Sequence, residues 1–123
     1  MGNYKELTVW QKSVDLITVI YSYTEPFPKE EIYSLTSQIR RSSISIPSHM
    51  AEGHSGRSRI DYIQFLKIAR GSCAELETQL MISKNSDYLR VTEFNYLIQK
   101  SEGISKMHDA LLPNCKYMLI PNA

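Results

Sequence analysis

The sequence has little cysteine and no long apolar run. Its 123 residues include two cysteines, Cys73 and Cys115, which are too few for a disulfide framework and form no C-x-x-C pair. We therefore expect neither a metal ribbon nor a thioredoxin-like redox motif, and a reducing cytoplasm is the simplest location. The longest apolar stretches fall far short of the ~18 residues that span a bilayer, and the first residues lack the apolar segment of a secretion signal. The sequence thus predicts neither secretion nor a membrane partner.

Glycine and proline are also scarce, with five of each, whereas hydrophobic residues make up 42% of the chain and charged residues 22%. This composition is typical of a folded protein and excludes a low-complexity or disordered chain. At ~100–200 residues per domain, it predicts a single domain over residues 1–123, in which residues 113–123 are expected to form a flexible tail.

The net charge is small but unevenly distributed. Fourteen lysines and arginines against thirteen acidic residues give a formal +1, which argues against a strongly basic binder of polyanions. Residues 37–70, however, hold six cations against only Glu52 and Asp61, a local +4. Arginine suits planar, bidentate contacts with phosphate or carboxylate, so these cations are the candidate nucleic-acid-binding residues. The six are Arg40, Arg41, Arg57, Arg59, Lys67 and Arg70. The alternative is that they form ordinary solvated faces or salt bridges between subunits.

Apolar residues recur at three- and four-residue steps along most of the chain, and no alternating run requires a strand. This periodicity predicts four helices. The first is expected from Val9 to Tyr23, the second from near Lys29 to Gly53, the third from Ser58 to about Ser83, and the fourth from Thr92 until Pro113 ends it. Short loops between helices of this length favour an all-α, antiparallel up-down-up-down four-helix bundle.

Several residues predict local features of these helices. Pro47 lies inside the second helix and is expected to kink or split it, because proline has no backbone N–H to donate. The carbonyl near Ser43 is thereby left without its helical hydrogen bond. Ser58 and Thr92 are expected to cap the third and fourth helices. Gly71, inside the third helix, is expected to let another backbone come close.

No catalytic set is evident. His49, Glu52 and His54 form an H-x-x-E-x-H pattern, but at about 100° per residue His54 lies nearly opposite Glu52 on a helix. Capping or hydrogen bonds at the bundle end are therefore favoured over a metal site. The serines lack a G-x-S-x-G turn, no phosphate-binding glycine loop is present, and Cys73 falls within an apolar stripe where we expect core. The sequence predicts no enzyme, no metal and no cofactor.

Acidic residues of the third helix offer possible partners for the arginines. We expect Glu75 and Glu77 on a solvated or interface face. An ion pair with Arg40 or Arg41 across the bundle is the alternative.

Residues 37–48 read SQIRRSSISIPS and are followed by Ala51-Glu52-Gly53. This run resembles the central signature of the 23S ribosomal RNA intervening-sequence proteins, which are small bacterial four-helix bundles. Further matches are Leu7-x-Val9-Trp10-Gln11-Lys12, Phe65-Leu66-x-Ile68-Ala69-x-Gly71-Ser72 and Glu75-Leu76-Glu77-Thr78. The matched stretches contain the motif residues Gln38, Pro47, Glu52, Gly53, Gly71 and Glu75. The chain departs from the family pattern at Ser42, His49 and Met50, where the family usually carries Ala, Asn and Ile.

The resemblance implies a ring-shaped homopentamer related to the accessory bundle protein of diversity-generating retroelements, a basic barrel for which binding of nucleic acid and of its reverse transcriptase is expected. On matching positions, it makes Arg40, Arg41 and Arg57 the basic residues of interest. The leading hypothesis is a non-catalytic oligomeric protein that binds RNA, with arginines on phosphate and tyrosines available for stacking. The alternative is a protein-interaction scaffold in which the same arginines pair with carboxylates between subunits.

Overall fold

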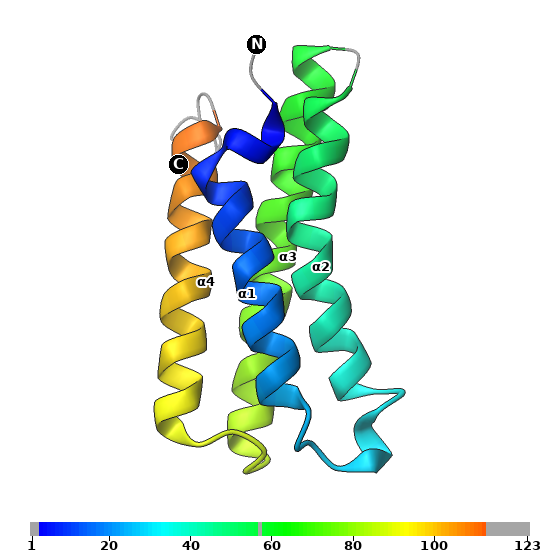
Figure 1. The fold of residues 1–123 in the computed structure, drawn as a ribbon, viewed down its shortest axis with the longest axis vertical. Coiled ribbons are helices and arrows are strands. Elements are labelled where there is room, and N and C mark those ends of the chain that lie inside the picture. The colour runs from blue at the N-terminus through cyan, green and yellow to red at the C-terminus, as the bar shows by residue number, and fades with distance from the viewer. Residues whose placement is uncertain (1–2, 57, 113–123) are drawn as a thin grey trace, which may run out of the picture.

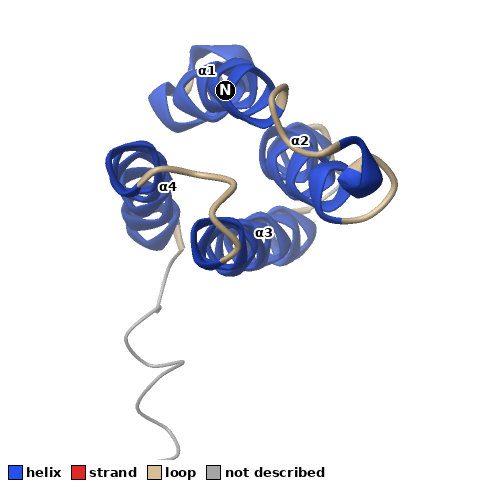
Figure 2. Ribbon diagram, turned by 90° about the horizontal axis from the view of Figure 1, so that it is seen from below, coloured by secondary structure: helices blue, strands red, loops and turns tan. Residues whose placement is uncertain are grey.

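The structure, a computed structural model, describes residues 3–56 and 58–112; Arg57 and the expected tail at 113–123 lie outside the described residues (Figure 1). It contains four long helices, α1 (Thr8–Thr24), α2 (Leu35–His54), α3 (Arg59–Asn85) and α4 (Val91–Leu111), and two 3-10 turns at Tyr4–Glu6 and Lys29–Glu31. Each helix runs antiparallel to the next, and seen along the bundle they follow one another in the order α1, α2, α3, α4 (Figures 1 and 2). The described ranges contain no strand. The predicted all-helical, four-helix fold is confirmed.

Each helix contributes one apolar stripe to a common core, as its periodicity predicts. Ile20 of α1, Ile39 and Ile46 of α2, Leu76 of α3 and Leu97 of α4 have no exposed surface. Burying one such side chain contributes about 1.5–3 kcal/mol, so the packed stripes hold the helices together. None of the described helices is both long and apolar enough to cross a bilayer.

Helices α2 and α3 make the most extensive contact of any pair. Small residues allow it: the hydroxyls of Ser45 and Ser72 lie 2.7 Å apart, and a Cβ added to Gly53 would stand 2.6 Å from Phe65 Cβ. Gly71, by contrast, is exposed and has nothing within 4 Å of its missing Cβ. The predicted close approach at Gly71 is therefore wrong within this chain, and the glycine that permits one is Gly53.

The predicted cap of α3 is confirmed, and that of α4 is wrong. The Ser58 hydroxyl accepts a hydrogen bond from the Asp61 backbone N–H at 3.1 Å. Thr92 lies inside α4, which begins one residue earlier. There the Glu93 carboxylate accepts the backbone N–H of Arg90, the residue just before the helix, at 2.8 Å.

The second helix also starts later than predicted. Residues Lys29–Glu31 form a separate 3-10 turn, and Ser34 takes a non-helical backbone (φ −132°) before α2 begins at Leu35. The Ser34 hydroxyl accepts the Leu35 N–H at 2.6 Å, which caps the new helix. From there α2 continues through Pro47, so the proline does not split it; a kink at this point stays a prediction.

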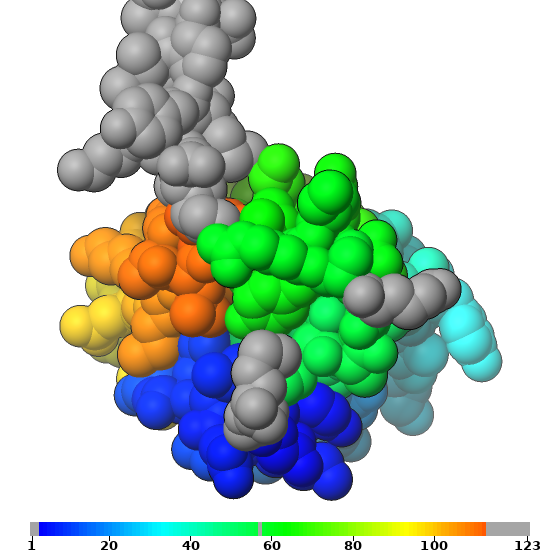
Figure 3. Space-filling model, turned by 90° about the horizontal axis from the view of Figure 1, so that it is seen from above, coloured from blue at the N-terminus to red at the C-terminus, as the bar shows by residue number. Residues whose placement is uncertain are grey.

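Aromatic rings close the upper end of the bundle. The Tyr4 ring lies 5.3 Å from that of Trp10 and 6.1 Å from that of His54, and the Tyr62 ring lies 5.9 Å from that of His54. Seen from above, the blue N-terminal segment lies beside the green end of the bundle (Figure 3), and its turn at Tyr4–Glu6 contacts α2.

Candidate nucleic-acid interface

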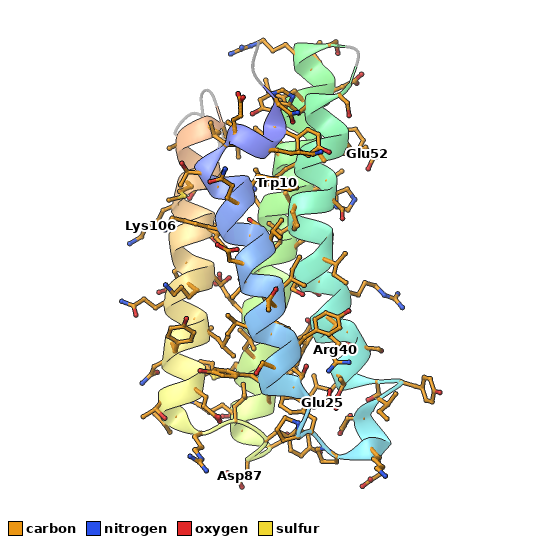
Figure 4. The ribbon with its side chains drawn as sticks, viewed as in Figure 1. Trp10, Glu25, Arg40, Glu52, Asp87 and Lys106 are labelled. Carbon is orange, nitrogen blue, oxygen red and sulfur yellow. The ribbon has the colours of Figure 1, made fainter. Side chains whose placement is uncertain are left out.

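Arg40 is held by its own chain. From α2 its Nε donates to Thr24 Oγ1 at 3.0 Å, and its guanidinium lies 4.3 Å above the Tyr21 ring. The Glu25 carboxylate is 3.5 Å away, and Figure 4 places the two side chains next to each other. Since the Glu25 side chain is 84% exposed, the ion pair contributes at most about 1 kcal/mol. Arg40 thus fastens the end of α1 to α2, and its carboxylate partner belongs to the same chain.

Arg70 is engaged in the same way on the other side of the bundle. Its Nε donates to the Asp109 carboxylate at 2.9 Å, which joins α3 to α4. Burial alone would lower the pKa of Arg70, but the hydrogen bond and the charge of Asp109 outweigh it, so that the pKa is raised. A second candidate cation therefore serves the fold.

The remaining described candidates are Arg41, Arg59 and Lys67. Arg41 and Arg59 are exposed, Lys67 is half-buried, and none of them forms an ion pair with another described residue. Arg59 is the first residue of α3, whereas Arg41 lies thirteen residues before the end of α2, about 20 Å below it. The structure does not bring the predicted cations into one patch, and Arg57 lies outside the described residues.

Two of the candidate cations, Arg40 and Arg41, line the same hollow of the surface. A shallow cavity of about 350 Å³, which we call the Arg41 cavity, is lined by Arg41, Arg40, Tyr21, Ile32 and Ser37. Tyr21 is 40% exposed and Ile32 47% exposed. The cavity thus combines an aromatic and aliphatic wall with an unpaired guanidinium and a hydroxyl. The sequence did not predict that Tyr21 and Ile32 are exposed at one cavity, because both fall within apolar stripes that predict burial.

The acidic residues of α3 divide between two roles. Glu75 is exposed, as expected. Glu77 is not on a solvated face: its carboxylate accepts hydrogen bonds from the hydroxyls of Ser101 at 2.8 Å and Ser105 at 3.3 Å, both on α4. The predicted alternative of an ion pair with Arg40 is also wrong, because Arg40 pairs with Glu25.

The three residues of the H-x-x-E-x-H pattern point to different surroundings. His49 Nδ1 lies 2.8 Å from the Ser45 carbonyl and its ring stacks on Phe65. Glu52 points outward into solvent (Figure 4), and His54 lies between aromatic rings. Within the part of the chain that the structure describes, no three His, Cys, Asp or Glu side chains gather around a point. Of the motif residues, Gln38, Glu52, Gly71 and Glu75 are exposed, and Pro47 and Gly53 are buried.

Two titratable groups lie in the core. Cys73 is buried, as predicted, and burial raises the pKa of its thiol to about 11, which disfavours the reactive thiolate. His108 is also buried: its Nδ1–H donates to the Ile104 carbonyl at 3.0 Å, its Nε2 has no partner among the described residues, and burial lowers its pKa. Neither group reaches a surface where it could meet a substrate.

Comparison with known proteins gives the chain a family. The sequence profile of the 23S rRNA-intervening sequence protein family matches residues 5–110. The chain is also similar to the crystal structure of a protein of unknown function from the S23 ribosomal protein family of Bacteroides thetaiotaomicron, with a TM-score of 0.78 and 23% identity, covering 86% of this chain and 99% of that chain. At this identity the likeness concerns the fold alone, and no protein of curated function matches the sequence. Because the profile runs from the first 3-10 turn almost to the end of α4, this chain belongs to the 23S rRNA-intervening sequence protein family.

Proposed function

We propose that this chain is a non-catalytic bundle protein that assembles with copies of itself and binds RNA at the Arg41 cavity. The observation that carries the proposal is the cavity itself, which exposed Arg41 lines together with Tyr21 and Ser37. The Arg41 guanidinium, which forms no ion pair with another described residue, suits a phosphate. The face of the Tyr21 ring that Arg40 does not cover suits an unpaired base. The family name refers to a 23S rRNA-intervening sequence, which agrees with RNA as the ligand. The proposal also includes a relation to the accessory bundle protein of diversity-generating retroelements.

Self-assembly would strengthen such a site. The ring-shaped homopentamer that the resemblance implies would repeat the Arg41 cavity around the ring. Several weak cavities that engage one RNA molecule together bind it more tightly than one cavity can, without any new contact. This accounts for RNA binding by a chain whose net charge is only +1.

The test is the affinity for a structured RNA with an unpaired loop, measured by fluorescence anisotropy over a range of salt concentrations. Arg41→Ala should weaken binding and reduce the salt slope by roughly 0.7–0.9 for each phosphate that the guanidinium no longer neutralises. Arg40→Ala is a poor probe, because Arg40 also fastens α1 to α2.

A matched control is Arg90→Ala. Arg90 is exposed, as Arg41 is, but it lines a different cavity with Tyr23 and Asp87. Both variants lose one positive charge, so only a local contact distinguishes them. Equal affinities of the Arg41→Ala and Arg90→Ala proteins would refute a site at the Arg41 cavity.

A second candidate is a protein-interaction scaffold, and exposed isoleucines favour it. Ile60, Ile68 and Ile82 on the outer side of α3 are 72%, 47% and 47% exposed, and Ile44 on the outer side of α2 is 40% exposed. Apolar residues that recur along one outward face mark an interaction surface.

Light scattering tests this candidate. Ile68→Glu should lower the mass of the assembly, because it places a charge on the outer face of α3. Asn95→Glu adds a charge at an exposed position on α4 and should leave the mass unchanged. An unchanged mass for Ile68→Glu would contradict self-association through α3.

A further inference from the structure

A groove of about 550 Å³ runs between α1 and α4, the neighbouring pair of helices that make the least contact. Its inner wall is apolar and its edges are charged. The wall includes Leu16, Val19, Ile104 and Met107, and the charged residues of the edges are Lys12, Asp15 and Lys100. The groove lies apart from the Arg41 cavity and plays no part in the function proposed above.

Gly103 of α4 leaves this groove open. It lines the groove, and a Cβ added to it would meet nothing within 4 Å. Its backbone is helical and does not need a glycine, since no described glycine has a positive φ. Glycine weakens a helix relative to alanine, and no described contact compensates for that loss. The open space is therefore suited to a segment that packs directly against the α4 backbone.

We propose that residues 114–121 of the same chain, which read NCKYMLIP, dock in this groove. Helix α4 ends at Leu111, and the groove lies along α4 from Met107 back to Tyr96, about 16 Å of helix. The eleven residues 113–123 can span up to about 36 Å, so they can turn at Pro113-Asn114 and cover the whole groove.

The chemistry of the segment matches that of the groove. Tyr117-Met118-Leu119-Ile120 is an apolar run that suits the apolar wall. Lys116, just before it, can pair with Asp15, which is the one carboxylate among the described residues that line the groove and forms no ion pair with another described residue. The match with the groove rests chiefly on the apolar run, since Lys12 and Lys100 also line the edges. The short connection to α4 gives the segment a high effective concentration at its own groove, which favours it over a second copy.

Cys115 allows a direct test in the full chain. A nitroxide reagent at neutral pH should modify Cys115 and spare Cys73, which is buried. In isotopically labelled protein, the spin label should remove the amide signals of Gly103 and Met107 and leave that of Gly71, on the outer side of α3. If the amide signals of Gly103 and Met107 both remain, the proposal is overturned. In a mixture of isotopically labelled chains without nitroxide and unlabelled chains with it, loss of the same signals would also overturn it, because the segment would then come from a second copy.

A pair of glycine variants gives an independent test. Gly103→Leu fills the groove without touching a described atom near its Cβ, and Gly71→Leu makes the same change at an exposed helical site outside the groove. We expect Gly103→Leu to restore the Met107 signal and to lower the thermal midpoint, and Gly71→Leu to do neither. A midpoint raised equally by both variants, with the Met107 signal still absent, would overturn the proposal.

Discussion

Replacing Gly53 with alanine is expected to destabilise the bundle, although alanine is the better helix former. The new Cβ would stand 2.6 Å from Phe65 Cβ, an atom bonded directly to the α3 backbone. The contact can be relieved only if α2 and α3 move apart, and such overpacking costs about 1–3 kcal/mol. The gain in helix propensity is at most about 1 kcal/mol, so the net loss is about 0–2 kcal/mol.

Gly71→Ala separates the two effects. It makes the same chemical change inside α3, where nothing lies within 4 Å, and should stabilise the chain by about 0.5–1 kcal/mol. The free energies of unfolding of the two variants should therefore differ by about 1–3 kcal/mol, the cost of the contact with Phe65. Urea denaturation followed by circular dichroism measures this difference.

Equal stability of the Gly53→Ala and Gly71→Ala proteins would refute the close packing of α2 on α3. Both should be measured at two protein concentrations, because a second copy that covers Gly71 would make its effect depend on concentration.

Three further predictions concern charged and buried groups. Asp109→Asn should cost about 0.5–1 kcal/mol in urea denaturation at low salt, since the pair with Arg70 is partly exposed, and the cost should shrink at high salt; a cost independent of salt would contradict an ionic contribution. Burial lowers the pKa of His108 below 6.5, so the unfolded chain takes up the proton at a higher pH than the folded chain does. The free energy of unfolding should therefore fall as the pH drops through about 6.5, by up to ~1.4 kcal/mol per pH unit. His108→Gln should flatten this part of the pH profile, and identical profiles of the two proteins would refute the assignment. Cys73 should react with a thiol reagent only as fast as the bundle opens, measured by peptide mass mapping with and without urea, and immediate reaction in buffer would contradict its burial.

The fold could be read from the sequence because its signals are local. Apolar residues at three- and four-residue steps select which side of each helix leaves water, and short loops make consecutive helices antiparallel. Ile39 and Leu97 are buried, as the apolar stripes predict. Ser58 caps α3 through a hydrogen bond with Asp61, which is only three residues away in the sequence. The start of α2 could not be predicted, because Ser34 breaks the helix through its backbone conformation, which periodicity does not report.

The candidate site could be predicted only in part. Composition and the family signature marked the basic segment, and they gave Arg40 and Arg41 equal weight. Neither signal predicts that Tyr21 lines the same cavity as Arg41, because that depends on how α1 packs against α2. The sequence thus identified the candidate cations but not the residues that each of them contacts in the folded chain.

By itself the sequence determined four amphipathic helices, their antiparallel order and the family, because these depend on residues close to one another along the chain. Only the tertiary structure decided how two residues of the same type differ in their contacts, as Arg40 differs from Arg41 and Gly53 from Gly71. Arg40 and Arg41 are adjacent, but successive side chains point about 100° apart around a helix. Arg40 therefore contacts Thr24 and Glu25 at the end of α1, whereas Arg41 is exposed and lines the Arg41 cavity without an ion pair to another described residue. Likewise Gly53 lies against Phe65 of α3 and Gly71 faces open space. The physical reason is that an ion pair or a steric contact depends on which helix lies opposite, and that is set by the packing of all four helices together.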